Sequence, residues 1–494
     1  MKLVQLFIAA FSTLLLCPVV SSGDEALPRL KVSENRRFLV TEDGAPFFWL
    51  GDTAWELFHR LDKEETLVYL DNRQKLGFNV VQAVVVAELD GKTRPSAEGF
   101  LPFGPDPKEP KPVEVEGDYN DYWDRVDFVV REANRRGIYV AMLPTWGRYW
   151  RDESFFNPSN AGDYGEWLGK RYKDAGMIWI LGGDRHIDND EQRKTLEEMA
   201  AGLRRGDGGA HLISFHPGGG RGSSEYWRES DWLDFHMRQN GHNIDFNSYK
   251  KTCDDYNLEP TKPVIDGEPV YEDHPVSFNP DNLGHTTAFD VRKPLYWDVF
   301  NGAFGHTYGC HEIWQMFDPD DEAQYPVNRP LKCWRDGINC PGAAQMQYCK
   351  KLIESRPFLS RVPDIDLIVP DEVYSSVPGA GTRRFAATRD QEGTYALIYF
   401  PIGRAATIDV GRLNAKTLRA WWYDPRNGSW QTIGEFANEG KKTFTPPTMG
   451  EDLDMILVID DASKNYPAPG VVENKGAEKG ALGTRTLPNG AKLK

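Results

Sequence analysis

Two carboxylates stand where short apolar stretches end, and their positions suit acid–base chemistry. Asp184 lies in the segment WILGGDRH, and Glu268 lies in the segment VIDGEPVYE. A pair of carboxyl groups can cleave a glycosidic bond, because one protonates the departing oxygen while the other attacks or stabilises the sugar carbon. The two glycines before Asp184 leave room for a substrate. We therefore predict Asp184 and Glu268 as catalytic residues. The alternative for Asp184 is a structural ion pair with a neighbouring arginine.

Further polar and aromatic residues lie at the ends of the other apolar stretches. The interior of a barrel sheet is apolar, so polar groups at all eight ends are better explained by one site than by chance. Asp52 fits a third acid and a cap of the following turn equally well. Trp55, Trp146 and Trp314 fit either sugar platforms or packing at the rim. The predicted substrate-binding residues are Asp52, Trp55, Gln82, Trp146, Arg185, His186, His216, Gln239, His242, Tyr271, Tyr308 and Trp314.

The elements that would position these residues alternate between apolar and amphipathic stretches. Most of the apolar stretches are nearly continuous, as expected for parallel strands buried on both faces, and helical segments separate them. Eight such units predict a (β/α)8 barrel, in which the fourth and seventh strands lie on opposite sides of the mouth. The helix around 224–232 is the weakest of the set. The predicted strands are 47–52, 79–86, 138–144, 177–183, 211–216, 233–239, 263–268 and 305–314.

The segments outside this repeat indicate a second domain. RFLVTEDGAPFFW, before the first strand, predicts a hairpin that either plugs the bottom of the barrel or pairs with the C-terminal domain. We place the barrel at 28–357, with a last helix at 342–355. Short alternating segments separated by Gly, Pro and Asn-Gly turns, the first of them an apolar stretch at 366–370 expected as a strand, predict a small antiparallel β-sandwich over 358–461. The composition of 462–494 predicts a disordered tail.

Charge and the first residues restrict the partners and the compartment. The 494 residues include 58 Lys and Arg against 74 Asp and Glu, a formal net charge of −16, which argues against nucleic acid as a partner. Residues 1–23 carry Lys2, a short apolar run and small residues at the end, which is typical of a secretory signal peptide. That run is too short to span a bilayer. We expect a secreted or periplasmic protein without membrane insertion, and the oligomeric state stays open.

Six cysteines include one in the leader, which leaves an odd number in the mature chain. Cys333 and Cys340 share one loop and are the predicted disulfide, because an exported chain meets an oxidising compartment. No close pair of cysteines has a matching partner pair, so the sequence contains no zinc-binding motif. We expect no metal and no cofactor.

Several segments, in order, resemble the apiosidase-like hydrolases, glycoside hydrolase family 140. These segments are FFWLGDTAWEL, GFNVVQ, LPTW, WILGGDRH, SFHPGGG, RQNGH, DGEPVYE and FNGAFGHTYGCHEIW, and the resemblance runs from about 28 to 460. It implies a (β/α)8 catalytic barrel followed by a collagen-binding-type β-sandwich. It also implies a retaining mechanism with Asp184 as acid/base and Glu268 as nucleophile, and an exo-acting or side-chain-directed enzyme on pectin that releases apiose-linked sugar. The expected partner is therefore a polysaccharide or an oligosaccharide.

Two other functions fit parts of the pattern. A metal-dependent amidohydrolase would use histidines at strand ends, here His186, His216, His242 and His311, but the first strand holds Gly-Asp-Thr where a His-x-His pair is expected. A non-catalytic carbohydrate-binding protein would not need both carboxylates. A serine esterase is disfavoured, because GxSxG is absent.

Overall fold

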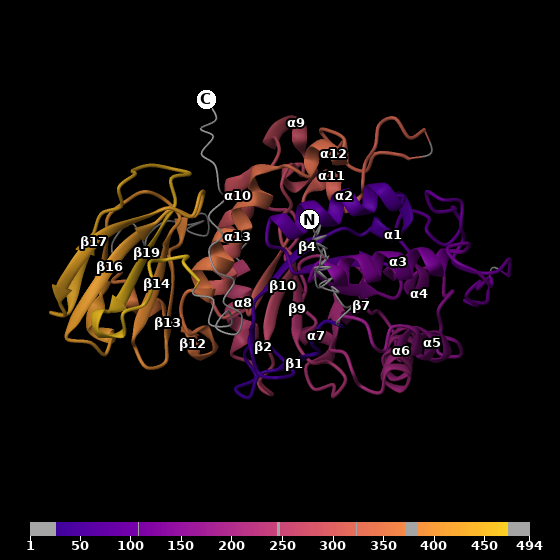
Figure 1. Ribbon diagram of the computed structural model, residues 1–494, viewed down its shortest axis with the longest axis horizontal. Helices are drawn as coiled ribbons and strands as arrows, with labels where there is room; N and C mark the ends of the chain where they lie inside the picture. Colours follow the sequence, from indigo (N-terminus) through magenta and orange to yellow (C-terminus); the bar gives the residue numbers. More distant parts are fainter. Residues whose placement is uncertain (1–25, 107, 245–247, 323, 371–382, 473–494) are drawn as a thin grey trace, which may run out of the picture.

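The structure is a computed structural model of the chain, and it describes residues 26–472 except for 107, 245–247, 323 and 371–382 (Figure 1). The predicted leader at 1–23 and the part of the predicted tail beyond 472 lie outside the described residues.

Eight parallel strands form a curled sheet that closes into a barrel, as predicted. Six are paired in the order β11-β4-β5-β6-β7-β8, and β9 pairs with β10. Backbone hydrogen bonds also connect the two parts of the barrel. Between β8 and β9, Asp234 N–H donates to Ile213 O at 2.9 Å, and between β10 and β11, Phe304 N–H donates to Val264 O at 3.0 Å. The strands are β4 (Trp49–Thr53), β5 (Val80–Val84), β6 (Tyr139–Leu143), β7 (Met177–Gly182), β8 (Ile213–His216), β9 (His236–Gln239), β10 (Val264–Glu268) and β11 (Gly305–Tyr308).

Helices connect the strands and cover the outside of the barrel (Figure 1). Their starts follow capping rules: the Asp121 side chain accepts from the Trp123 and Asp124 N–H groups at the beginning of α3. The helix expected around 224–232 is only the four-residue α7 (Ser224–Trp227). The longer helices are α2 (Lys63–Lys75), α3 (Tyr122–Arg135), α5 (Ala161–Arg171), α6 (Asp190–Asp207), α8 (Ser248–Tyr256), α10 (Ala288–Phe300) and α13 (Pro341–Glu354).

The predicted N-terminal hairpin is present and covers the bottom of the barrel. β2 (Leu39–Thr41) pairs with β3 (Pro46–Phe47), and β1 (Leu30–Val32) adds a third strand. Phe47 packs edge-on against Tyr139, the first residue of β6, with ring centroids 5.3 Å apart. The hairpin therefore lies at the end of the barrel away from the carboxyl ends of its strands.

The C-terminal domain is an antiparallel sheet with a small second layer. Six strands are ordered β12-β13-β14-β19-β16-β17, and β15 pairs with β18. The apolar stretch expected as a strand at 366–370 instead begins in a short 3-10 turn at Ile365–Leu367. The strands are β12 (Arg361–Pro363), β13 (Ala386–Asp390), β14 (Tyr395–Phe400), β15 (Ala406–Asp409), β16 (Thr417–Tyr423), β17 (Trp430–Ala437), β18 (Lys441–Phe444) and β19 (Met455–Asp461).

The first residues of the predicted tail are part of the described structure. Residues 462–472 are described and make specific contacts: Tyr466 bonds to the Thr394 hydroxyl at 2.8 Å, and Gly470 N–H donates to Ser355 Oγ at 3.3 Å. Disorder is therefore not observed at 462–472, because the Tyr466 hydroxyl finds a partner on the C-terminal domain and the Gly470 amide finds one at the end of α13.

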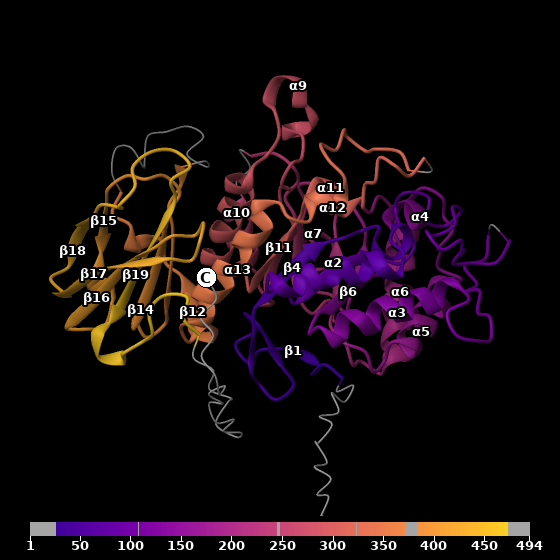
Figure 2. The same cartoon turned by 45° about the horizontal axis from the view of Figure 1, so that its top comes forward.

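The two domains share a buried interface. Helices α10 and α13 lie between the barrel and the C-terminal sheet (Figure 2). Arg292 of α10 forms a two-bond ion pair with Asp454, at 2.8 and 2.5 Å, and both side chains are almost fully buried. Tyr296 stacks on Tyr399 with centroids 5.1 Å apart. The sheet thus packs on the barrel with one face and on β15 and β18 with the other.

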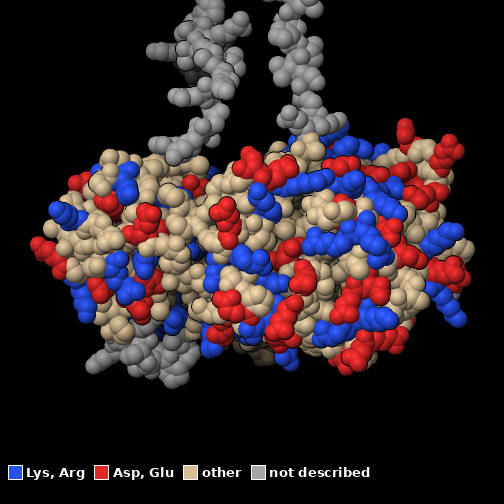
Figure 3. All heavy atoms as spheres, turned by 90° about the horizontal axis from the view of Figure 1, so that it is seen from below, with Lys and Arg blue, Asp and Glu red and all other residues tan. Residues whose placement is uncertain are grey.

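On the face in Figure 3, basic side chains are interspersed with acidic ones. Within the described part of the chain, no helix is both long and apolar enough to cross a membrane.

Candidate active site

A cavity of about 240 Å³ opens at the carboxyl ends of the barrel strands. It brings together eight of the residues predicted from the sequence: Trp55, Trp146, Asp184, Gln239, His242, Glu268, Tyr271 and Trp314. Glu88, Gly219, Gly241, His274, Phe278, Val327 and Asn328 complete its lining. Polar groups at the ends of separate strands thus meet in one pocket, as the barrel geometry requires.

An unusual backbone turn presents Asp184 to this pocket. Gly182, Gly183 and Asp184 have φ values of +99°, +97° and +51°, all in the left-handed region. A Cβ atom on Gly182 would lie 2.2 Å from the carbonyl oxygen of His216, and one on Gly183 would lie 2.8 Å from the amide nitrogen of Gly147. The two glycines therefore let the chain turn sharply between neighbouring segments and aim Asp184 inward.

Glu268 is the last residue of β10 and is surrounded by histidines. His216 Nε2 lies 2.8 Å from Glu268 Oε2, and His242 Nε2 lies 3.3 Å from Glu268 Oε1. The pairing of β10 with β9 shifts register between Asp266 and Glu268, a local irregularity that re-aims the end of the strand. Both carboxylate oxygens of Glu268 thus have a ring nitrogen within reach.

One histidine links the two carboxylate residues. The Asp184 N–H donates to His216 Nδ1 at 3.2 Å, so Nδ1 accepts and the ring proton belongs on Nε2. Nε2 is the atom beside Glu268. His216 therefore lies between the two residues, with Nδ1 toward the backbone N–H of residue 184 and Nε2 toward the carboxylate of residue 268.

The pKa values of the two carboxyls move in opposite directions. Burial and the negative charge of Glu268 raise the pKa of Asp184, against smaller opposing effects of His216 and Arg185. Burial alone would raise the pKa of Glu268, but hydrogen bonds from His216 and His242 outweigh it and hold that pKa well below its usual range. Near neutral pH, Glu268 is ionised and Asp184 is biased toward its protonated form.

Glu88 is a third carboxyl of the pocket, and the sequence prediction missed it. Burial, followed by the charges of Asp184 and Glu56, raises the pKa of Glu88 to about 8. It follows β5 by four residues, near the start of the long segment that connects β5 to α3. A signal was present, because Glu88 comes two residues after the predicted end of that strand at residue 86.

Some buried polar atoms at the pocket have no hydrogen-bond partner among the described residues. They include Trp146 Nε1, Gln239 Oε1, His242 Nδ1 and the Tyr271 hydroxyl. Leaving such an atom unpaired costs about 1–3 kcal/mol, so buried donors and acceptors usually have a partner, a water or a ligand. A polar ligand such as a sugar could supply these hydrogen bonds.

The three tryptophans of the pocket pack against their neighbours and offer little open ring surface on which a sugar could stack. Trp55, Trp146 and Trp314 are only 2%, 1% and 7% exposed. Trp55 and Trp146 pack against the His216 ring, with centroids 5.3 and 6.1 Å apart. Of the two roles that the sequence left open, the structure favours packing that fixes the histidine.

Asp52 does not reach the pocket and is a correction to the prediction. It is fully buried, accepts from Arg73 Nε at 2.7 Å and accepts from the Tyr69 hydroxyl at 2.5 Å. Both partners belong to α2, the first long helix after β4. Asp52 therefore anchors this helix to the barrel.

Gln82 and Tyr308 also lie outside the pocket lining. Gln82 Nε2 donates across the barrel to the carbonyl of Gly267 at 2.8 Å, so it supports the residue before Glu268 from below. The Tyr308 hydroxyl donates to Glu272 Oε2 at 2.6 Å and is buried. Both residues support the site and do not line it.

Arg185 and His186 lie at the edge of the site. Arg185 contacts Asp184 Oδ2 and Asp152 Oδ2, each at 3.3 Å, so the alternative of an ion pair for Asp184 is partly realised. His186 is exposed, and its Nδ1 lies 3.2 Å from the Tyr226 hydroxyl. Neither residue lines the cavity.

The predicted pairing of Cys333 with Cys340 differs from the structure. All five described cysteines are free thiols. Cys333 receives a hydrogen bond from Arg335, whereas the Cys340 sulfur lies 3.9 Å from that of Cys310. The two residues precede different helices, α12 (Trp334–Gly337) and α13, and spacing along the chain does not reveal this difference.

The histidines of the metal-dependent alternative do not form a common ligand group. Among the described residues, the one group with ligand atoms close enough for an ion contains aspartate, cysteine and glutamate but no histidine. His216 and His242 approach Glu268 instead.

Comparisons with known proteins agree with this geometry. Residues 33–360 match a family model described as "Apiosidase-like, catalytic domain". Residues 362–460 match one described as "Putative collagen-binding domain of a collagenase". No curated protein matches the chain significantly.

Two solved structures are similar over most of the chain. One, described as "Glycoside hydrolase", is 32% identical, with 89% of this chain and 98% of that chain covered and a TM-score of 0.81. The other, described as a glycoside hydrolase family 5 protein from Bacteroides vulgatus ATCC 8482, is 33% identical, with 90% and 95% covered and a TM-score of 0.81.

Proposed function

Because the chain belongs to the apiosidase-like glycoside hydrolases, we propose that it is an exported retaining enzyme that releases a sugar from side chains of plant pectin. Asp184 is the acid/base of this proposal and Glu268 is the nucleophile. The observation that carries it is the placement of two carboxyls with opposite pKa shifts in one pocket.

In the first step, the ionised Glu268 attacks the anomeric carbon of the bound sugar. The bond to the leaving-group oxygen breaks, and Asp184 donates its proton to that oxygen. His216 and His242 keep Glu268 ionised, and burial beside an anion raises the pKa of Asp184 and so favours its protonated form. The products of this step are a glycosyl ester on Glu268 and the released remainder of the substrate.

In the second step, water attacks the same carbon and Asp184 accepts its proton. Glu268 carries no charge while it is esterified, so the charge that raised the pKa of Asp184 is gone and Asp184 becomes a better base. Glu268 leaves as a carboxylate, and the site returns to its starting protonation. One negative charge thus controls when residue 184 acts as acid or as base.

The size of the pocket supports a small ligand. Its volume of about 240 Å³ lies below the usual range of about 300–1,000 Å³ for ligand sites. Unpaired donors and acceptors at Trp146 and Gln239 suit sugar hydroxyls. These features favour binding of a terminal sugar, as an exo-acting or side-chain-directed enzyme requires.

Variants of the two carboxyls test the assignment with an aryl apioside that has a good leaving group. Glu268→Ala should lower kcat by at least about 1,000-fold, because no nucleophile remains. Asp184→Ala should still form the glycosyl-enzyme with this substrate but should be strongly impaired with a poor leaving group, which needs a proton.

Added azide separates the roles further. Azide should restore turnover of Asp184→Ala and give a glycosyl azide that retains the anomeric configuration. It should also restore turnover of Glu268→Ala, but with a glycosyl azide of inverted configuration. Asp188→Asn is the matched control, since Asp188 is an exposed acid of the same loop outside the cavity. If azide rescues neither variant, the roles are assigned incorrectly.

A further inference from the structure

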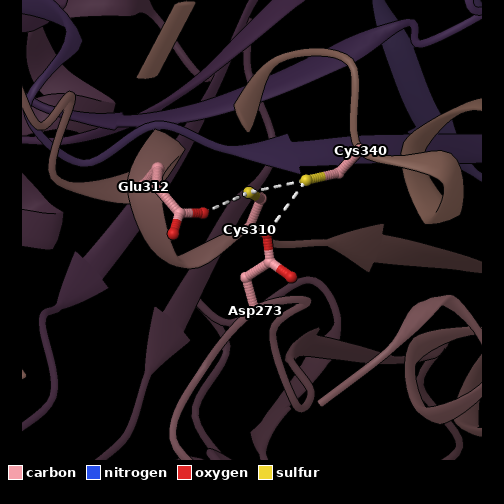
Figure 4. A group of neighbouring side chains, drawn as sticks. All are labelled: Asp273, Cys310, Glu312 and Cys340. Atoms are coloured by element: carbon pink, nitrogen blue, oxygen red, sulfur yellow. Dashed lines mark hydrogen bonds between the residues drawn. The ribbon is translucent and has the colours of Figure 1, made fainter. Parts of the chain in front are cut away.

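Four potential metal ligands meet beside the active site, outside the lining of its cavity. They are Asp273, Cys310, Glu312 and Cys340, and their side chains point toward one another (Figure 4). Asp273 follows β10, Cys310 and Glu312 follow β11, and Cys340 precedes α13. The fold thus brings three separate segments to one point.

The ligand atoms lie close enough together for one small ion, and the distance between the two sulfurs matches that expected around zinc. All four lie within 4.8 Å of one another. The two sulfurs are 3.9 Å apart, the Cys310 sulfur is 3.2 Å from Glu312 Oε2, and the Cys340 sulfur is 3.2 Å from Asp273 Oδ2. Two thiolates bound to one tetrahedral zinc at about 2.3 Å are about 3.8 Å apart, and a thiolate and a carboxylate oxygen about 3.6 Å.

A disulfide fits this spacing less well. A disulfide requires a sulfur–sulfur distance of about 2.05 Å, so the two sulfurs would have to approach by nearly half their separation. The carboxylates beside each sulfur would also have no role in such a bond. The spacing and the donor set both favour an ion.

The surroundings suit a closed, charged centre. Cys310 and Glu312 are 0% exposed and Cys340 is 3% exposed. Leu331 N–H donates to Glu312 Oε1 at 2.9 Å, which orients the carboxylate and leaves Oε2 toward the sulfurs. Lys332 Nζ lies 2.5 Å from Asp273 Oδ2 and 3.4 Å from the Cys340 sulfur. One Zn²⁺ and one ammonium would offset three of the four negative charges of two thiolates and two carboxylates.

We propose that Asp273, Cys310, Glu312 and Cys340 bind one zinc ion as a structural site. Four protein ligands leave no open position, which is the property of structural rather than catalytic zinc. The ion would fasten the segments that carry Tyr271 and His274 on one side and His311 and Trp314 on the other. The inference does not depend on the identity of the sugar or on the roles of Asp184 and Glu268.

The test measures metal in the full chain. The protein is purified under reducing conditions, freed of metal by a chelator, dialysed against excess zinc and then against buffer, and analysed by mass spectrometry. We expect about one zinc per chain, a melting temperature several degrees above that of the metal-free protein, and protection of two thiols from alkylation by zinc. Cobalt in place of zinc should give the absorption of tetrahedral cobalt with thiolate charge transfer.

Variants identify the ligands. Cys310→Ser and Cys340→Ser should each lower the retained zinc by at least about tenfold, whereas Cys333→Ser, which changes a nearby cysteine outside the group, should retain it. If a ligand variant fails to fold, the cobalt spectrum of the unaltered chain still decides the question. Absence of bound zinc and of the thiolate band, or a Cys310–Cys340 disulfide in the isolated protein, would overturn the proposal.

Discussion

At the level of single residues, two carboxyls acquire different chemistry from their neighbours. Asp184 lies near an anion, and Glu268 lies between two imidazole rings. His216 touches both residues, through Nδ1 on one side and Nε2 on the other. One imidazole ring thus connects the backbone of residue 184 to the carboxylate of residue 268.

Glu88 should make the stability of the fold depend on pH. The folded chain keeps the Glu88 proton up to about pH 8, whereas an unfolded chain loses it near pH 4.5. Between these values the folded state holds the extra proton, so rising pH favours unfolding. Replacing Glu88 by Gln should remove this contribution. The free energy of unfolding of the variant should exceed that of the parent by an amount that grows across this window, to on the order of 2–4 kcal/mol.

Denaturant unfolding of both proteins at several pH values measures this difference. Glu153→Gln serves as the control, because Glu153 is a more exposed carboxyl outside the cavity and Lys92 pairs with it. A difference between parent and Glu88→Gln that stays constant from pH 4.5 to 8 would contradict the raised pKa of Glu88.

The prediction that polar residues at the carboxyl ends of the strands form the site identified most of the pocket, but it did not assign every residue its role. It located eight lining residues, because a parallel barrel must bring its carboxyl ends together. It erred at Asp52, since an acid that pairs with Arg73, 21 positions later, looks the same in sequence as an acid that faces a substrate. It also missed Glu88, which lies near the start of the long segment between β5 and α3. The sequence pattern alone does not predict whether a side chain at a strand end points into the pocket or toward a neighbouring helix.

At the level of elements, the turn after β7 is the most constrained feature of the site. Its two glycines combine left-handed backbone with close contact to other segments. Gly183→Ala should lower kcat by about 100-fold, because the new Cβ would press on Gly147 and Trp146 and displace the carboxyl of Asp184. Steady-state kinetics together with thermal unfolding measure this effect.

Gly209→Ala separates crowding from backbone strain. Gly209 has φ of +77°, but nothing lies within 4 Å of its Cβ position. This control should lose about 1–2 kcal/mol of stability and keep its activity. Equal kinetics for the two variants would mean that the turn does not position Asp184.

The barrel strands were predictable because burial on both faces leaves continuous apolar runs. The C-terminal strands were harder to predict. The exposed strand β18, KKTF, has no alternation of apolar and polar residues. The apolar stretch at 366–370, expected as a strand, overlaps a 3-10 turn at Ile365–Leu367 instead. Where one face is solvated or the strand is short, hydrophobic pattern alone specifies little.

At the level of the whole molecule, the two domains act as one packed unit. The ion pairs Arg292–Asp454 and Arg356–Asp460 cross from the barrel to the C-terminal sheet and are buried. Neither was predictable, because the partners are 162 and 104 residues apart. The same limit hid the contact between Cys310 and Cys340. Local pattern predicted both domains, but contacts between distant segments required the fold.

The most direct test of the central claim is to trap the covalent intermediate. The enzyme is incubated with a 2-deoxy-2-fluoro aryl glycoside of the sugar it releases, digested with a protease and analysed by mass spectrometry. We predict one added glycosyl group on the peptide that contains Glu268, still formed by Asp184→Ala and lost in Glu268→Ala. A label on Asp184 or Glu88, or inverted products without any label, would contradict the account.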